Sequence, residues 1–313
     1  MKVFIAGGTG AIGKILVPHL VENGHEVVVL VRSVEKTEAA ESMGAKAAPA
    51  DPLDREALTA AIRSAEPDVI MHQLTALSGL GSFRKFDEDF ALTNRFRTEV
   101  TDTMLAAARM VGARRFIAQS FCGWPFAREG GPIKTEEDPL DPNPPESFSK
   151  TLAAIRHVEA AVQATEDTEA LALRYGILYG PGTSFASDGS IVDLVRKRRM
   201  PIVGDGAGIW SFIHVEDVAR ATMAAMSRGE PGVYNVVDDE PAPVSTWLPF
   251  LADVVGAKPP LKLPAWLGKI AIGDGGVSMM TRSRGGSNAS ARRAFEWQLV
   301  YPSWRRGFVE ELG

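Results

Sequence analysis

Three regularly spaced glycines near the N-terminus could hold a phosphate group. Gly7, Gly10 and Gly13 lie between an apolar run, Val3–Ala6, and a helical pattern, Ala11–Glu22. In a strand–turn–helix unit this spacing permits a tight turn, close approach of a pyrophosphate and packing of the helix on the strand. Free amides at the positive end of the helix can then bind the pyrophosphate. We therefore predict a dinucleotide-binding turn with contacts from Gly7, Thr9, Gly10, Ala11, Ile12 and Gly13.

The residue after the second apolar run bears on which dinucleotide binds. NAD sites usually have an acidic residue there, but Val31 is followed by Arg32, with Lys36 close behind. A guanidinium pairs well with a 2′-phosphate, which a carboxylate would repel. The sequence therefore favours NADP over NAD, unless Arg32 is only a surface residue at a strand end.

Apolar runs that alternate with helical patterns must position these residues. The runs are nearly continuous in apolar residues, which is typical of a parallel sheet covered on both faces. This alternation predicts an α/β fold, a doubly wound Rossmann sheet with a smaller C-terminal lobe for the substrate. The predicted strands are Val3–Ala6, Glu26–Val31, Ala45–Ala50, Val69–His72, Phe116–Ser120, Ala170–Tyr175, Trp210–His214 and Val233–Val237. The predicted helices are Ala11–Glu22, Arg55–Ser64, Phe90–Val111, Ser149–Ala164, Val215–Arg228 and one capped by Ser245 that ends near Val255.

The domain organisation follows from the same alternation. Residues 1–175 form the expected NAD(P)-binding domain, completed by about 210–237. Residues 176–209 and 238–313 form the expected smaller lobe. The segment Pro125–Pro145 has no periodicity and is rich in Pro, Gly and acidic residues, as binding loops and lids often are.

Composition excludes several classes of protein. The formal net charge of -5 does not favour nucleic acid binding, and no apolar run approaches the ~20 residues that span a bilayer. Cys122 is the single cysteine, which rules out an internal disulfide and fits a cytoplasmic location. No His, Cys and Asp cluster has the spacing of metal ligands, so we expect no metal. The expected partner is a small-molecule substrate, without nucleic acid or membrane.

Several motifs recur in the order found in one protein family. Together they resemble the extended short-chain dehydrogenase/reductases of the NAD-dependent epimerase/dehydratase family. The resemblance implies cofactor contacts from Asp51, Leu53, Gln73, Leu74, Thr75 and Asn94, and a homodimer built on the long helices. The motifs are Gly7–Gly13, Asp51–Asp54, Val69–Ala76, Asn94, Phe116–Ser120, Arg174–Gly182 and Phe212–Ala219.

The chain departs from this family at the acid/base group. The family uses Tyr-x-x-x-Lys, in which the lysine lowers the pKa of a phenol that gives or takes the proton. Lys150 resembles the lysine, but Glu146 stands four residues before it. A second alignment, anchored on Glu159, puts Thr151 and Ile155 at the two positions. Neither alignment supplies a tyrosine, so the chain resembles an atypical member.

Few residues remain that could assist the reaction. Ser120 or Cys122 lies where relatives have a serine-rich strand end, and either one is also an ordinary packing residue. Tyr175 replaces a proline that lies beside the nicotinamide in the family, at a strand end where ligands bind. We therefore assign Ser120, Tyr175 and Lys150 as candidate catalytic residues, with a packed aromatic as the alternative for Tyr175.

Another departure concerns the substrate. Sugar-nucleotide members often carry Arg-Asp where this chain has Trp210-Ser211, and an indole cannot bind a diphosphate as a guanidinium does. The sequence thus predicts an NADP(H)-dependent oxidoreductase acting on a carbonyl or alcohol of a small, non-nucleotide molecule. Two alternatives are a non-catalytic NADP(H)-binding sensor and an NAD-dependent sugar-nucleotide epimerase or dehydratase.

Overall fold

Seven parallel strands form the central sheet of the computed structural model, which describes residues 1–76 and 83–313. The order across the sheet is β3-β2-β1-β4-β5-β7-β12. The strands carry mostly apolar residues and are largely buried, because helices cover both faces. Their bounds are β1 Lys2–Ala6, β2 Glu26–Val31, β3 Lys46–Pro49, β4 Val69–His72, β5 Arg115–Phe121, β7 Glu169–Tyr175 and β12 Gly232–Val236.

The strand order reverses between β1 and β4. The chain leaves β1 toward β2 and β3, then crosses back to β4 and continues outward through β5, β7 and β12. A crevice forms beyond the carboxyl ends of the strands at such a switch point, and ligands of doubly wound sheets bind there. This confirms the predicted Rossmann fold.

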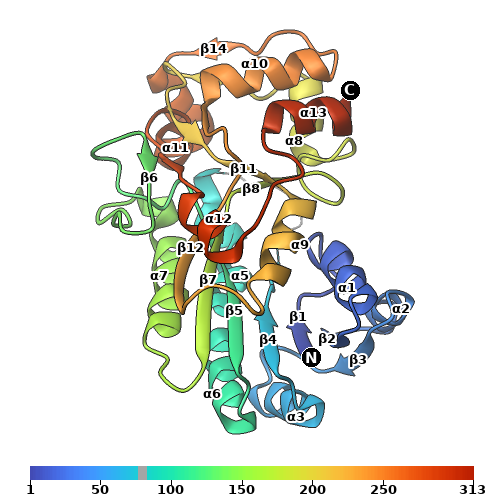
Figure 1. Cartoon of the computed structure of the whole chain (residues 1–313). Coiled ribbons are helices and arrows are strands. Elements are labelled where there is room, and N and C mark those ends of the chain that lie inside the picture. The colour runs from blue at the N-terminus through green and yellow to red at the C-terminus, as the bar shows by residue number, and fades with distance from the viewer. Residues whose placement is uncertain (77–82) are drawn as a thin grey trace.

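The side chains of β1 alternate between the two faces of the sheet. Val3 and Ile5 pack with α1 (Gly13–Glu22) and α9 (Val215–Ala224). Phe4 and Ala6 pack on the opposite face with three other helices, α3 (Arg55–Ala65), α6 (Thr101–Val111) and α7 (Ser149–Gln163). The two apolar layers hold the sheet between them (Figure 1).

The predicted helix Phe90–Val111 is not continuous. It consists of α5 (Ala91–Arg95), a π-helical turn η2 (Phe96–Val100) and α6. A short helix α4 (Phe86–Asp89) precedes it, after the 3-10 turn η1 (Phe83–Lys85). A π-turn inserts one residue into the helical repeat, and such turns are frequent at functional sites.

Three other local predictions were wrong or incomplete. Ser245 does not cap a helix: α10 spans Val244–Val254 and Pro243 precedes it. Trp210–His214 divides into β10 (Ile209–Trp210) and β11 (Phe212–His214), which pair with different strands. The helix α2 (Val34–Ser42) was not predicted, although Ser33 caps it by accepting a hydrogen bond from the Lys36 amide.

A second apolar cluster lies beyond the carboxyl end of the sheet and is rich in aromatic residues. Its buried members include Tyr179, Trp210, Phe212, Trp247 and Trp304. Figure 1 shows α10, α11 and α13 together at this end of the molecule. The elements that surround the cluster are β8 Ile177–Tyr179, α8 Ser190–Arg196, β9 Ile202–Val203, β13 Ala242–Pro243, β14 Lys262–Leu263, α11 Ala265–Thr281 and α13 Trp304–Leu312. The helix α12 (Ala289–Phe295) packs instead with the apolar layer that contains α9.

The segment Pro125–Pro145 is tied to this part of the chain. Its short strand β6 (Ile133–Lys134) pairs in parallel with β15 (Gly285–Gly286), and a bridge joins Phe126 to Leu140. A 3-10 turn η3 (Glu146–Phe148) then leads into α7. The segment is therefore anchored beside the carboxyl ends of the strands.

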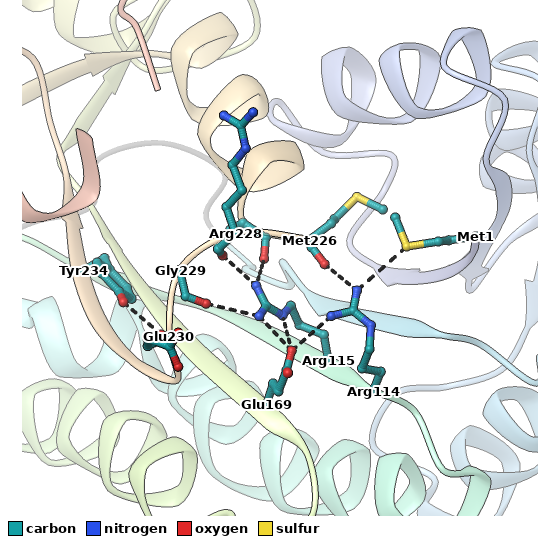
Figure 2. Close-up of polar contacts among 10 residues, drawn as sticks. Met1, Arg114, Arg115, Glu169, Met226, Arg228, Gly229, Glu230 and Tyr234 are labelled. Carbon is teal, nitrogen blue, oxygen red and sulfur yellow. Dashed lines mark hydrogen bonds and ion pairs between the residues drawn. The ribbon is translucent and has the colours of Figure 1, made fainter. Parts of the chain in front are cut away.

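A polar cluster joins the amino-terminal ends of β5 and β7 to the end of α9 (Figure 2). The buried Arg115 donates to the Glu169 carboxylate at 2.7 Å and to the carbonyls of Ala225, Arg228 and Gly229. A cation suits the negative end of a helix. This cluster lies at the opposite end of the sheet from the crevice, so its role is structural.

Candidate active site

The Gly-rich turn has the geometry of a phosphate cradle. Gly7 has a φ of 99°, and a Cβ there would lie 2.5 Å from the Gln73 carbonyl oxygen. A Cβ on Gly13 would lie 2.2 Å from the Gly8 oxygen, so this glycine lets α1 pack against the turn. At Gly10 the nearest atom would be the Gly7 oxygen at 3.4 Å, which leaves this side of the turn open.

Free amides at the start of α1 complete the cradle. Within the described residues, the N–H groups of Ala11, Ile12 and Gly13 have no backbone acceptor, and no side chain caps the helix. Together with the helix dipole they favour a bound anion. The Gly182 loop closes over this turn, because a Cβ there would lie 3.6 Å from the Ala11 Cβ.

Two cations lie near the carboxyl end of β2. Arg32 and Lys36 are both exposed, and Ser33 between them caps α2. At β3, Asp51 accepts a hydrogen bond from the Leu53 amide at 3.0 Å and so orders the acidic turn. Arg32, Lys36, Asp51 and Leu53 lie where the sequence predicts contacts with the adenosine part of the cofactor.

The carboxyl end of β4 faces the Gly-rich turn. Gln73 is buried, and its backbone amide donates to the Ala6 carbonyl of β1. The Leu74 carbonyl accepts from the Gln119 amide group at 2.8 Å, while Thr75 is exposed. The structure thus brings Gln73, Leu74 and Thr75 to the edge of the crevice.

His72, at the end of β4, has a structural role. Its Nε2 lies 2.9 Å from the Phe96 carbonyl, and its Nδ1 accepts from the Leu74 amide at 3.3 Å. Burial lowers the pKa of His72 to about 4, so the ring is neutral at physiological pH.

The start of α7 carries a hydrogen-bonded hydroxyl and no tyrosine. Thr151 is buried; its Oγ1 donates to Asp87 at 2.7 Å and accepts from the Asn94 amide at 3.0 Å. Asp87 also accepts from the backbone amides of Lys150 and Thr151, which places a carboxylate at the positive end of the helix. The Lys150 side chain is exposed, and Ile155 is buried one turn further along.

Ser120 belongs to a buried ionic cluster. Its Oγ donates to the Glu159 carboxylate at 2.7 Å, and Arg174 holds the same carboxylate through two hydrogen bonds of 2.7 Å. Ser120 is only 4% exposed, so its hydroxyl is committed to this cluster. Cys122 is also enclosed, and burial raises the pKa of its thiol.

Tyr175 is directed into the core. Its side chain is 2% exposed, and its hydroxyl bonds to Thr222 at 2.7 Å and accepts from Gln73 at 3.0 Å. Burial raises the pKa of this phenol to about 12. Tyr175 is therefore a packed aromatic residue, which was the alternative to a catalytic role. Its hydroxyl does not face the crevice.

An aromatic cavity lies beyond the ends of β5 and β7. It is lined by residues of several elements: Phe121, Cys122, Gly123, Trp124, Ile177, Ile209, Trp210, Ser211, Met279 and Ser283. The Trp210 indole donates to the Met279 carbonyl at 3.0 Å, so it is fixed as part of the wall. Such a wall suits a flat, apolar group better than a diphosphate.

Three polar side chains carry buried atoms that have no hydrogen-bond partner within residues 1–76 and 83–313. They are the Gln73 Oε1, the Asn94 Oδ1, and the Nε and Nη1 of Arg97. Buried polar groups are nearly always hydrogen-bonded, so these atoms mark places where a ligand can bind. Our sequence reasoning did not identify Arg97 or Trp124. The sequence feature that could have identified Arg97 is an arginine at a helix position that faces the interior of the protein.

The described ranges, 1–76 and 83–313, contain no group of three His, Cys, Asp or Glu residues that could hold a metal ion. In the same ranges no helix is long and apolar enough to cross a membrane.

A sequence model of the NAD dependent epimerase/dehydratase family matches residues 3–236. The chain belongs to this family. It is an NAD(P)-binding oxidoreductase of the short-chain dehydrogenase/reductase superfamily, in agreement with the resemblance of its motifs. The family's glycine-rich turn and crevice are therefore present in this member, while its acid/base tyrosine is absent.

Two curated relatives are reductases. A 3-diazoavenalumate denitrifying reductase from Streptomyces sp is 42% identical over 312 residues, which cover 99% of this chain and 100% of the relative. A 4-hydroxy-2-methyl-3-oxo-4-farnesyl-3,4-dihydroquinoline-1-oxide ketoreductase from Stigmatella aurantiaca is 28% identical, with coverage of 82% and 74% respectively.

The fold is shared with solved epimerases. The structure of Thermus thermophilus UDP-glucose 4-epimerase complexed with NAD has a TM-score of 0.75 and 23% identity. The match covers 100% of this chain and 98% of the epimerase. At this identity the similarity establishes the architecture alone.

Proposed function

We propose that this protein uses NADPH to replace the diazo group of a small aromatic acid by hydrogen, with release of N₂. The observation that carries the proposal is the missing proton donor. Neither alignment of the acid/base motif supplies a tyrosine, and the Thr151, Ser120 and Tyr175 hydroxyls bond to other protein groups. The 42% identity with a denitrifying reductase along the whole chain supports the same reaction.

The chemistry explains why a proton donor is dispensable. Reduction of a carbonyl makes an alkoxide that must be protonated, so a general acid contributes roughly 10²–10⁴ in rate. An aryl diazonium ion is a cation, and hydride addition neutralises it. The C–H bond forms, the C–N bond breaks with its electron pair retained by N₂, and NADPH is oxidised to NADP⁺. No proton enters this balance.

The aromatic cavity would hold the ring for this transfer. Trp124 and Trp210 line it beside Phe121, at the end of the strand that precedes the expected nicotinamide position. Fixing the ring against the nicotinamide converts a bimolecular step into one within the complex, which alone supplies a large part of the catalysis.

The preference for NADP rests on Arg32. Its guanidinium and the Lys36 ammonium are exposed at the end of β2, where a 2′-phosphate would lie. We expect Arg32→Ala to weaken NADPH binding at least tenfold, as for the loss of a charged hydrogen bond. The affinity for NADH should stay within about twofold of the wild-type value. Calorimetry measures both, and the exposed Arg63→Ala is the control. Equal affinities of the wild type for NADPH and NADH would contradict the preference.

The reaction is tested with 3-diazoavenalumate and NADPH carrying deuterium at C4 of the nicotinamide. We expect N₂ release by mass spectrometry and one deuterium at the carbon that carried the diazo group. Both stereoisomers of the labelled cofactor are needed, because the protein transfers only one of the two hydrogens. Absence of N₂ release with both isomers would rule out the reaction.

A second candidate is carbonyl reduction, because the more distant relative is a ketoreductase. Turnover of a panel of aryl ketones without N₂ release from the diazo acid would favour it. Tight NADPH binding without any turnover would favour a sensor, and purification with bound NAD and a UDP-sugar would favour an epimerase. A homodimer and a cytoplasmic location remain predictions.

A further inference from the structure

Arg97 is a buried arginine without a counter-ion. Its side chain is 5% exposed, and its Nε and Nη1 have no hydrogen-bond partner among the residues that the structure describes. Burial lowers the pKa of the guanidinium to about 10, so it still carries its charge at neutral pH. An unpaired buried charge costs several kcal/mol by rough estimate, and that cost calls for an explanation.

The helix directs this charge toward Phe90. Arg97 lies in the π-turn η2, and side chains on a helix lean toward its N-terminus. The Arg97 Cζ accordingly lies 6.0 Å from the ring centre of Phe90, which is seven residues earlier in the chain. Nearby, Thr93 accepts from the Ala76 amide at the end of β4, so this part of the helix borders the crevice.

A row of aromatic rings connects Arg97 with the cavity. Phe90 stacks on Phe86 with ring centres 4.2 Å apart. Phe86 meets Trp124 edge-on at 5.5 Å, and Trp124 lines the cavity. The guanidinium therefore lies at one end of an apolar wall, with the expected hydride-transfer site at the other end.

The groups around Arg97 do not neutralise it. His72 is neutral, and the charge of Arg97 is one reason for its low pKa. Asp87 is occupied by Thr151 and by two amides at the start of α7, while Glu99 pairs with the exposed Arg95 at 2.7 Å. The pyrophosphate of the cofactor has its own cradle at Gly7–Gly13. The remaining ligand that can bring an anion into the crevice is the substrate.

We propose that Arg97 binds the carboxylate of the substrate and so selects aromatic acids over neutral analogues. The proposal rests on the proposed function for the class of substrate. The guanidinium can donate charge-assisted hydrogen bonds to a carboxylate, and its Nε and Nη1 have no partner among the described residues. The acid group would anchor one end of the molecule while the aromatic wall aligns the ring.

Binding of avenalumate tests this without turnover, because this acid is what denitrification of 3-diazoavenalumate would leave. Calorimetry in saturating NADP⁺ compares avenalumate with its primary amide for wild type, Arg97→Met and Arg97→Lys. We expect Arg97→Met to weaken binding of the acid at least tenfold and binding of the amide less than twofold. Arg97→Lys should recover part of the affinity for the acid. Arg95→Gln, an exposed position on the same helix, is the matched control.

Thermal unfolding separates binding from folding. We expect Arg97→Met to have an equal or higher Tm, because an unpaired buried charge is replaced by an apolar chain of similar length. Equal weakening of acid and amide, or undetectable binding of the acid to wild type, would overturn the proposal. Arg97-dependent binding without N₂ release would leave the carboxylate site intact and refute only the denitrification reaction.

Discussion

At the scale of single residues, the hydroxyls that sequence reasoning assigned to catalysis are engaged within the protein. Ser120 donates to Glu159, and Tyr175 bonds to Thr222 and Gln73. The sequence showed which residue types stand at the strand ends. The sequence did not show that Glu159 on α7 and Thr222 on α9 would form hydrogen bonds with these hydroxyls, because both partners come from distant segments.

Tyr175→Phe tests this placement. The variant loses buried hydrogen bonds, so we expect a loss of about 1–2 kcal/mol in the free energy of unfolding and a Tm lower by a few degrees. We expect kcat and KM to stay within about twofold of wild type. Tyr234→Phe is the control, because its hydroxyl also donates within the fold, to the Glu230 carbonyl. A hundredfold loss of kcat at an unchanged Tm would restore Tyr175 as a catalytic residue.

At the scale of elements, the glycines of the first turn have separable roles. In Gly13→Ala a Cβ would collide with the Gly8 carbonyl, so we expect a loss of about 1–3 kcal/mol in unfolding free energy. In Gly10→Ala the Cβ has room in the protein, so we expect an unchanged Tm and NADPH binding weakened at least tenfold. Denaturant unfolding and calorimetry measure the two effects. Normal NADPH binding by Gly10→Ala would show that the pyrophosphate does not pass there.

The Arg115 cluster in Figure 2 joins two strands to a helix end, and it makes a pH-dependent contribution. The hydrogen bond from Arg115 lowers the pKa of the Glu169 carboxyl. Its contribution to stability is therefore present above the ordinary Glu pKa and is lost as the pH falls through the lowered value. We expect Glu169→Gln to be less stable than wild type at pH 7, with the difference shrinking below about pH 4.

Unfolding in urea across this pH range measures the Glu169 effect. In the same experiment, Arg115→Met should cost about 2–4 kcal/mol, because three carbonyls, one of them fully buried, lose their donor. Arg109→Met, on an exposed position of α6, is the control. An unchanged stability of Arg115→Met would mean that water replaces the guanidinium.

At the scale of the whole molecule, Asp238 lies where the chain passes from β12 into the C-terminal part. It is 1% exposed, its Oδ2 has no partner within the described residues, and burial raises its pKa well above the ordinary value. Its amide donates to the Phe212 carbonyl, and its Oδ1 accepts from the Glu240 amide at 3.1 Å. The carboxyl thus bonds within its own turn, while the amide joins this turn to β11.

Asp238→Asn should stabilise the protein in a pH-dependent way. With a raised folded pKa, the contribution of the protonated carboxyl is complete below the unfolded pKa of about 3.9 and is lost as the pH rises through the folded value. The variant keeps the Oδ1 acceptor and does not ionise. We therefore expect its Tm to match wild type near pH 4 and to exceed it at pH 8. The exposed Asp253→Asn is the control, and a constant difference across pH would contradict the prediction.

Local patterns in the sequence were enough to predict the sheet and the cofactor turn. The apolar runs predicted the seven strands of the central sheet within one or two residues at each end, and the Gly7–Gly13 spacing placed the turn between β1 and α1. The missing tyrosine was also visible directly. These features need no knowledge of what packs against them.

The surroundings of the polar side chains could not be predicted without the folded structure. The π-turn of η2 directs Arg97 toward Phe90, and no periodicity in Phe90–Val111 predicted that break. The hydrogen bonds of the Thr151 hydroxyl likewise depend on Asp87 and Asn94, which lie more than fifty residues away in the chain. The burial and the hydrogen bonds of a polar side chain depend on residues that are distant in the chain. A local sequence pattern does not identify those residues.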